Sequence, residues 1–242
     1  MSSSAFNHYK YFLSKVYSWT LGDKADLFQK NAAWLMQNGI TEGKLLDLGA
    51  GFGSHAIPAA ELGLAVTAID FSSELLNELK KFDPSSKVKT VESDFITFLR
   101  HHSENYDYVL CLGDTLTDLA SLEMLNDLFQ SLVDQVSENG RLHLSWRDYQ
   151  TIPFMDSERF YIIKQDEKSI MTCVLEDENA KMITATDVLH TKIGNEFKVS
   201  GHSYQKLKLT PELVSDLLIK ADFDVIKTKV QGRIVELVAS KN

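Results

Sequence analysis

Three glycines, Gly49, Gly51 and Gly53, directly follow the apolar run Leu45-Leu46-Asp47-Leu48 of this 242-residue chain. Glycine has no Cβ and adopts positive φ without strain, so a turn of alternating glycines lets the main chain approach a ligand closely. A glycine turn alone is weak evidence, because many loops contain one. Its meaning depends on which side chains follow at matching places along the chain.

Two acidic residues stand where a nucleoside ligand would need them. Asp70 ends the next apolar run, about 20 residues after Gly49, where a carboxylate accepts hydrogen bonds from both hydroxyls of a ribose. Asp94 follows the third run, where a carboxylate accepts from an adenine amino group while Phe95 or Phe71 covers the ring face. This ordered set predicts a site for a nucleoside-containing cofactor.

The residues around the turn bear on which cofactor this is. The dinucleotide pattern is G-x-G-x-x-G/A, whereas Ser54 occupies its third glycine position here. Asp47, just before the turn, works against a pyrophosphate but can orient donors around a cationic amino-acid tail. A zwitterionic nucleoside such as S-adenosylmethionine (SAM) fits best. A nucleotide-dependent oxidoreductase and a non-catalytic SAM-binding protein remain as alternatives.

The elements that must position these residues follow from the hydrophobic pattern. Between residues 44 and 148, short apolar strands alternate with helical patterns at residues 72–82 and 119–136, which predicts βαβ units, and Asn139-Gly140 predicts a turn. Two amphipathic helices are expected ahead of the sheet. The remaining expected elements are those helices at residues 9–17 and 25–36, antiparallel strands within residues 159–207, a helix at residues 210–221, and a terminal hairpin of residues 225–230 and 234–239.

The glycine turn resembles motif I of class I SAM-dependent methyltransferases, Asp70 resembles their ribose-binding acid, and Asp94-Phe95 their adenine contact. The resemblance implies an α/β Rossmann-like sheet of seven mostly parallel strands with helices on both faces, and S-adenosylhomocysteine as product. We expect a helical lid at residues 1–40 and a SAM-binding domain at residues 41–150 and 208–242. The antiparallel insertion at residues 151–207 would then cover the substrate site.

Three stretches, residues 17–23, 111–114 and 146–149, resemble the glycine N-methyltransferase group more weakly. In that group the arginine matching Arg147 binds a substrate carboxylate, as a planar guanidinium does well. Asp114 can orient an amine, and Tyr149, Tyr11 or Tyr17 can hydrogen-bond it. Tyr17 and Trp19 offer aromatic faces to a sulfonium, and Leu112 is expected at the cofactor.

Purely structural roles are also possible for the predicted substrate residues. Asp114 is also suited to cap the following helical segment, and Arg147 with Asp148 is also suited to a surface ion pair. N-methylation of an amino acid or amine is favoured over O-methylation of a small carboxylate or hydroxyl compound. These two chemistries would share every cofactor residue.

Composition narrows the class of partner. With 25 basic and 34 acidic residues, the net charge of −9 repels nucleic acid and anionic membranes, so a small-molecule substrate is expected. Cys111 and Cys173 lie in apolar runs without metal-ligand spacing, which predicts buried thiols, with neither disulfide nor metal site. The pattern of a secretory leader is absent from the sequence, and a cytoplasmic protein is expected. Monomer and homodimer both stay open.

Overall fold

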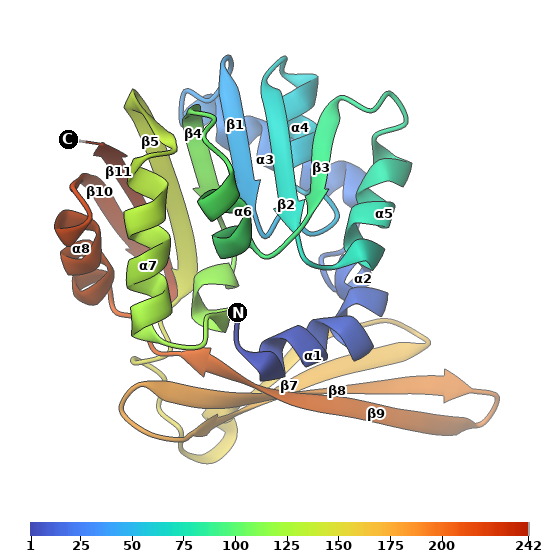
Figure 1. Ribbon diagram of the computed structural model, residues 1–242. Helices are drawn as coiled ribbons and strands as arrows, with labels where there is room; N and C mark the ends of the chain where they lie inside the picture. The colour runs from blue at the N-terminus through green and yellow to red at the C-terminus, as the bar shows by residue number, and fades with distance from the viewer. Residues whose placement is uncertain (242) are drawn as a thin grey trace.

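The computed structural model of the chain describes residues 1–241, with a seven-stranded sheet at its centre (Figure 1). Its strands are β1 (Lys44–Leu48), β2 (Ala65–Asp70), β3 (Val88–Glu92), β4 (Tyr106–Cys111), β5 (Val136–Arg147), β10 (Phe223–Gln231) and β11 (Ile234–Lys241). They lie in the order β10-β11-β5-β4-β1-β2-β3, with parallel pairing from β5 to β3. β11 runs antiparallel to β5 and to β10. The predicted Rossmann-like, mostly parallel sheet is confirmed.

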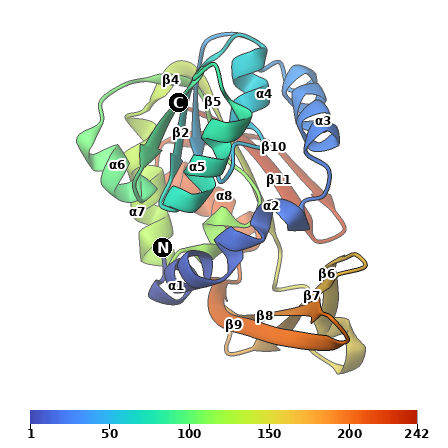
Figure 2. The same ribbon diagram turned by 90° about the vertical axis from the view of Figure 1, so that its right-hand side faces the viewer.

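Helices cover both faces of this sheet (Figure 2). One face packs against α3 (Lys24–Gln37), α4 (Ala56–Glu61) and α5 (Ser73–Phe82); the other packs against α6 (Phe95–His101), α7 (Leu122–Val133) and α8 (Pro211–Lys220). All of these helices except α4 begin at a side-chain cap: the Thr210 side chain, for example, accepts a hydrogen bond from the amide of Leu213, and Pro211 opens α8.

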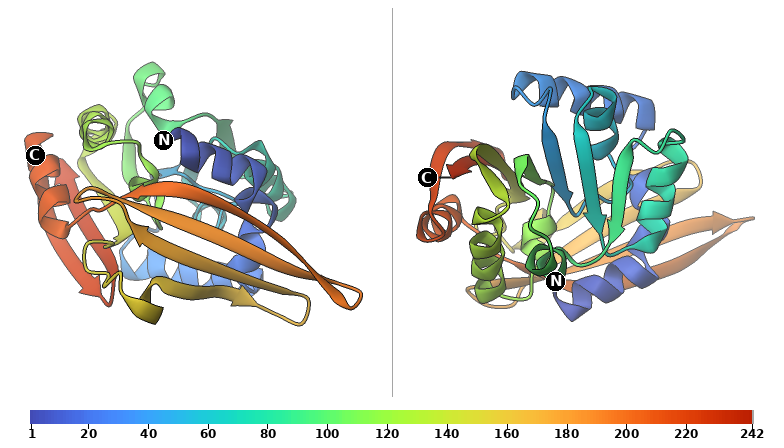
Figure 3. Two further views of the ribbon diagram at one scale, coloured as in Figure 1. Left: turned by 90° about the horizontal axis from the view of Figure 1, so that it is seen from below. Right: turned by 45° about the horizontal axis from the view of Figure 1, so that its top comes forward.

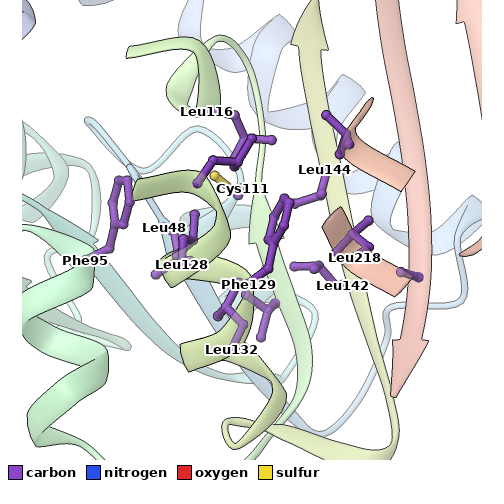
Figure 4. Close-up of a cluster of buried hydrophobic side chains, with 14 of the residues drawn as sticks. Leu48, Phe95, Cys111, Leu116, Leu128, Phe129, Leu132, Leu142, Leu144 and Leu218 are labelled. Atoms are coloured by element: carbon purple, nitrogen blue, oxygen red, sulfur yellow. The ribbon is translucent and has the colours of Figure 1, made fainter. Parts of the chain in front are cut away.

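The larger core lies between the sheet and α6, α7 and α8 (Figure 4). Leu128, Phe129 and Leu132 of α7 are fully buried there, because helical spacing places them on the face turned toward Leu142 and Leu144 of β5. Both cysteines are free and buried, as expected. This packing fixes the strands whose ends carry the site.

The N-terminal segment differs from the helix predicted at residues 9–17. Helix α1 (Ser3–Tyr11) begins earlier, because the Ser2 side chain accepts a hydrogen bond from the amide of Ala5. The helix stops at Phe12, whose φ of −130° leaves the helical region. The short turns η1 (Leu13–Lys15) and α2 (Tyr17–Thr20) follow, and α3 then occupies the second predicted helix.

A second, four-stranded antiparallel sheet confirms the predicted insertion. Its strands, β6 (Phe160–Gln165), β7 (Ser169–Asp177), β8 (Met182–Ile193) and β9 (Glu196–Leu207), lie in chain order after the short turn η3 (Asp156–Arg159). Figures 1 and 3 show this sheet crossing below the ends toward which β1 and β2 point, with α1 beside it. The insertion therefore covers the carboxyl edge of the central sheet.

The turn predicted at Asn139-Gly140 is wrong. Both residues lie within β5, where the pairing with β4 steps from Tyr106↔Val136 to Tyr108↔Arg141. The extra residues on β5 are accommodated as an irregularity in the strand rather than as a chain reversal. The predicted helix before it correspondingly ends at Val133.

No helix within residues 1–241 is long and apolar enough to cross a membrane.

Candidate functional site

A cavity of about 560 Å³ lies at the carboxyl edge of the central sheet. Its lining comes from the loops after β1, β2 and β4, from the end of β5, from α1 and α2, and from the insertion sheet, whereas Tyr149 does not line it. Open parallel sheets bind ligands at this edge, where neighbouring crossover helices leave from opposite faces. The fold thus brings the predicted cofactor turn and the predicted substrate residues to one space.

The glycine turn forms one wall of this cavity. Gly49 and Gly51 line it with φ of +73° and +56°. A Cβ on Gly49 would lie 2.7 Å from Thr115 Cγ2, and one on Gly51 would lie 3.3 Å from Tyr17 Cε1. Gly53 also has positive φ, but it faces Leu79 rather than the cavity. The turn is therefore bare main chain where it meets the open space.

Asp70 lies beneath this turn and lines the cavity. Its Oδ2 accepts a hydrogen bond from the Gly51 amide at 2.8 Å, and its Oδ1 accepts one from the Ser72 amide at 2.8 Å. Burial raises the pKa of Asp70 to about 6, although these amides oppose the rise. Each carboxylate oxygen has a second lone pair, so the oriented group can still accept from a ligand hydroxyl.

Asp47 is buried behind the turn and does not line the cavity. Burial and then the charge of Asp70 raise its pKa to about 7, and the Ala56 amide opposes that rise. Its Oδ2 has no hydrogen-bond partner in the described structure. Asp47 can therefore act on the turn only from behind it.

Aromatic rings form a second wall. Tyr17 and Phe71 line the cavity as predicted sites, together with Tyr9. The Tyr9 ring centroid lies 6.2 Å from that of Tyr17 and 5.5 Å from that of Phe71. Tyr9, not the exposed Tyr11, faces this space. Trp19 points elsewhere: its Nε1 donates to Asp166 Oδ2 at 2.7 Å.

Three other sequence-predicted cofactor residues lie outside the cavity lining. The exposed Asp94 caps α6, where its Oδ1 accepts from the Thr97 amide at 3.0 Å. Phe95 is buried in the larger core (Figure 4), and Leu112 packs against the cluster on the other face of the sheet. The arrangement does not bring these three to the glycine turn's open side.

Asp114, Arg147 and Tyr149 do come together. Asp114 Oδ1 accepts from the Arg147 amide at 2.9 Å, and Oδ2 accepts from the Tyr149 hydroxyl at 2.8 Å. The Arg147 guanidinium lies 3.7 Å from Asp114 Oδ2. Asp114 makes no side-chain cap to the following turn η2 (Thr115–Asp118), and Asp148 accepts from the Gln150 amide. These contacts favour the substrate-site interpretation over the cap and the Arg147–Asp148 pair.

The insertion adds a residue that the sequence analysis missed. Lys206 of β9 is buried, and its Nζ lies 2.6 Å from Asp118 Oδ1 and 3.9 Å from Asp114 Oδ2. Tyr204 and Lys206 share one face of β9, because side chains alternate along a strand. This i, i+2 pairing of an aromatic residue and a lysine is the only signal in the sequence, and it carries no motif.

Positively charged side chains and hydrogen-bond donors surround Asp114. Burial alone would raise its pKa, but Lys206, Arg147 and the hydrogen bonds from Tyr149 and from the Arg147 amide hold that pKa below the usual range. Asp118, next to it, has a raised pKa because it is more deeply buried. The neighbours of Asp114 therefore favour its ionised form, and its side chain is 25% exposed.

The methyltransferase domain family matches residues 45–140 of the chain. A glycine/sarcosine N-methyltransferase of Aphanothece halophytica is 33% identical over 113 residues, which are 45% of this chain and 42% of that protein. The corresponding enzyme of Halorhodospira halochloris is 29% identical over 113 residues, 45% of this chain and 41% of its own length. The match thus spans less than half of these relatives.

Solved structures share the fold over more of the chain. An S-adenosylmethionine-dependent methyltransferase from Clostridium acetobutylicum has a TM-score of 0.74 at 13% identity, covering 89% of this chain and 92% of its own. The methyltransferase CcbJ from Streptomyces caelestis has a TM-score of 0.76 at 16% identity, covering 88% and 89%. The SAM-bound amino pentose methyltransferase CalS10 from Micromonospora echinaspora has a TM-score of 0.72 at 14% identity, covering 94% and 96%.

At these identities the structural likeness establishes the fold, while the family match concerns the segment that holds the glycine turn, Asp70 and Asp114. The family match confirms the predicted recognition over this segment. Residues 45–140 of this chain match the methyltransferase domain family, as the resemblance to class I SAM-dependent methyltransferases implies.

Proposed function

We propose that the chain is a SAM-dependent methyltransferase that methylates the nitrogen of a small amine or amino acid. The observation that carries this is the cavity at the sheet edge, where the bare turn at Gly49 and Gly51 stands over the buried carboxylate of Asp70. Open main chain beside an oriented acid is what a nucleoside with a charged amino-acid tail requires.

The residues present fit SAM at this place. A Cβ on Gly49 would overlap Thr115 and one on Gly51 would crowd Tyr17, so the turn holds only glycine at these two positions, which supports a role for its main chain beside the amino-acid tail. Asp70 would hold the ribose hydroxyls, and the faces of Tyr17 and Phe71 would enclose the adenosine and sulfonium. This proposal gives no contact with SAM to the sequence-predicted cofactor residues that do not line the cavity, which are Asp47, Gly53, Trp19, Leu112, Asp94 and Phe95.

When bound, SAM supplies an electrophilic methyl carbon: the acceptor lone pair forms the new bond to it while the carbon–sulfur bond breaks and sulfur keeps the electron pair. The positive charge passes to the acceptor nitrogen, which then loses a proton to water. The chain's own task is to hold that nitrogen in line and to exclude bulk water. The N-terminal segment that lines the cavity, from α1 to α2, and the insertion at residues 151–207 serve this task.

For the acceptor, we propose that Arg147 holds a carboxylate and Asp114 accepts a hydrogen bond from the amine. The Arg147 side chain is 47% exposed and lines the cavity, so its guanidinium is available to a ligand. The glycine/sarcosine N-methyltransferases to which part of the chain is similar support a nitrogen acceptor. Tyr149 keeps Asp114 oriented from the buried side.

Calorimetric titration tests the cofactor assignment. We expect S-adenosylhomocysteine to bind and NAD not to bind, and an Asp70→Ala variant to lose at least about tenfold in affinity, because a hydrogen bond to a charged group contributes roughly 1.5–3 kcal/mol. Asp83→Ala is the matched control, since Asp83 is also buried and accepts a main-chain hydrogen bond, from Val88, away from the cavity. Unchanged affinity in Asp70→Ala would remove the ribose assignment.

Transfer of labelled methyl groups tests the acceptor. Glycine, sarcosine, an amino sugar and the matching hydroxy acid form the panel, and we expect transfer to the amines. Arg147→Lys should raise KM for carboxylate-bearing acceptors at least about tenfold, because lysine lacks the planar two-point grip, and should leave S-adenosylhomocysteine affinity unchanged. Arg141→Lys, at the exposed opposite part of β5, is the control. An equal loss for cofactor and acceptor would place Arg147 outside the acceptor site.

A further inference from the structure

Lys206 brings a buried positive charge from the insertion to the substrate end of the cavity. Its Nζ lies 3.3 Å from Thr117 Oγ1, in addition to its contact of 2.6 Å with Asp118. The ammonium also lies 5.1 Å from the centroid of the Tyr204 ring and 5.9 Å from that of Tyr149. Asp118 and these rings would suffice to hold a lysine in place.

Lys206 also contacts Asp114, which has other partners. Asp114 Oδ2, 3.9 Å from Nζ, already accepts from Tyr149 and lies beside Arg147. Asp114 Oδ2 therefore lies between two cations that come from different parts of the fold, β5 and the insertion. Burial of the acid would favour its neutral form, so these cations decide its charge.

We propose that Lys206 is a positioning residue for methyl transfer: its ammonium holds the Asp114 carboxylate ionised and oriented as a hydrogen-bond acceptor for the substrate amine. This rests on the proposed methyltransferase function. Asp114 then accepts the N–H of the acceptor without taking its proton, and the nitrogen lone pair stays free for the incoming methyl group. The insertion thereby completes the acceptor site electrostatically, in addition to covering it.

The charged and titratable groups around Asp114 come from every element packed against it. They are Arg147 and Tyr149 at the end of β5, Asp118 of η2, Lys206 of β9, Tyr9 of α1 and Tyr17 of α2, with Asp187 of β8 next to His8 of α1 beyond them. Of these, Lys206 and Arg147 are the cations within 4 Å of the carboxylate.

Lys208, one residue after the end of β9, offers a matched control. It is similarly buried and pairs with Asp177, with its ammonium 5.1 Å from the Phe154 ring centroid, but it does not line the cavity. Asp118→Asn offers a second control. It breaks the same buried ion pair as Lys206→Met but leaves the ammonium beside Asp114.

The experiment is a carbon-13 NMR titration of the aspartate side-chain carboxyls in the full chain, with the Asp114 signal assigned through Asp114→Asn. In Lys206→Met we expect the pKa of Asp114 to rise by about one unit or more, as loss of an opposite charge within about 4–6 Å implies. Lys206→Arg, Lys208→Met and Asp118→Asn should keep it low. An unchanged Asp114 pKa in folded Lys206→Met overturns the proposal.

An alternative variant and a binding measurement complete the test of Lys206. If Lys206→Met does not fold, a rise of the Asp114 pKa in Asp118→Asn overturns the proposal, and a low value supports it. S-adenosylhomocysteine affinity is measured on the same samples. Failure of the wild-type chain to bind it refutes the proposed function, whereas normal binding with an unshifted Asp114 refutes only the role of Lys206.

Discussion

The aspartates at the carboxyl edge of the central sheet differ in their pKa values because their neighbours differ. Asp47 and Asp70 lie together without a nearby cation, so burial raises both pKa values, to about 7 and about 6. Asp114 is held between Lys206 and Arg147, and its pKa is lowered. Aspartate thus has a raised pKa behind the glycine turn and a lowered pKa beside Lys206 and Arg147.

The raised pKa of Asp47 predicts a specific pH dependence of stability. A carboxyl whose pKa is higher in the folded state than in the unfolded chain stabilises the fold most below its unfolded pKa, and this contribution is lost as the pH rises through the folded pKa. For Asp47 the window runs from 3.8 to about 7. In the ligand-free chain, the free energy of unfolding of Asp47→Asn should therefore rise relative to that of the wild type across this pH window, by on the order of 3 kcal/mol at its upper end.

Urea unfolding at several pH values between 4 and 8 measures this difference. The comparison between variant and wild type cancels the titration of other groups. A difference in unfolding free energy that stays constant with pH would show that Asp47 keeps its usual pKa in the folded state.

At the scale of elements, the strand-turn-helix unit formed by β1, the glycine turn and α4 depends on close approach of two loops. Gly49 lies against Thr115, which follows β4, and there is no space for a side chain between them. Gly39 has nearly the same φ, +72°, but nothing lies within 4 Å of its added Cβ. Comparing a substitution at Gly49 with one at Gly39 therefore distinguishes the cost of backbone strain from the cost of steric overlap.

Gly49→Ala should lower the free energy of unfolding by roughly 2–4 kcal/mol, because overpacking adds to the cost of a left-handed backbone. Gly39→Ala should cost about 1–2 kcal/mol, from the backbone alone. Adding Thr115→Ala to Gly49→Ala should recover part of the difference. Equal losses in the two glycine variants, measured by urea unfolding, would contradict a tight contact at Gly49.

At the scale of the whole molecule, the cavity is shared by the central sheet, the N-terminal helices and the insertion. Trp19 of α2 bonds to Asp166 between β6 and β7, and Ser14 bonds to Ser72 at 2.9 Å, ahead of α5. The lid segments are therefore tied both to each other and to the sheet edge. A ligand in the cavity contacts all three parts and should stabilise them together.

S-adenosylhomocysteine at 100 times its dissociation constant should stabilise the fold by about 2.7 kcal/mol. For a chain of this length that corresponds to a rise in Tm of roughly 5–10 °C. Thermal unfolding monitored by circular dichroism measures it, with NAD at equal concentration and Asp70→Ala as controls. An equal rise with NAD would favour a general nucleotide site.

The sequence by itself determined the α/β sheet, the place of the glycine turn and the insertion. These follow from local patterns: apolar runs of strand length, helical spacing in α7, and a Thr-Pro start for α8. Two predictions from the sequence were wrong, and in both cases the reason is local. The Ser2 side chain caps a helix that begins earlier than the predicted one, and Asn139-Gly140 lies in the irregular part of β5, where the pairing with β4 steps from Val136 to Arg141.

Only the tertiary structure decided the charges and the neighbours of the proposed acceptor residues, Asp114 and Arg147. Asp114 and Arg147 were visible as motif residues, but Lys206 lies 92 positions after Asp114 on a strand without a motif, and Asp118 and Tyr9 join it from elsewhere. The same holds for Trp19, which the structure turns toward Asp166. Folding sets these distances, and because electrostatic interactions depend on distance and burial rather than on sequence order, no local pattern can reveal them.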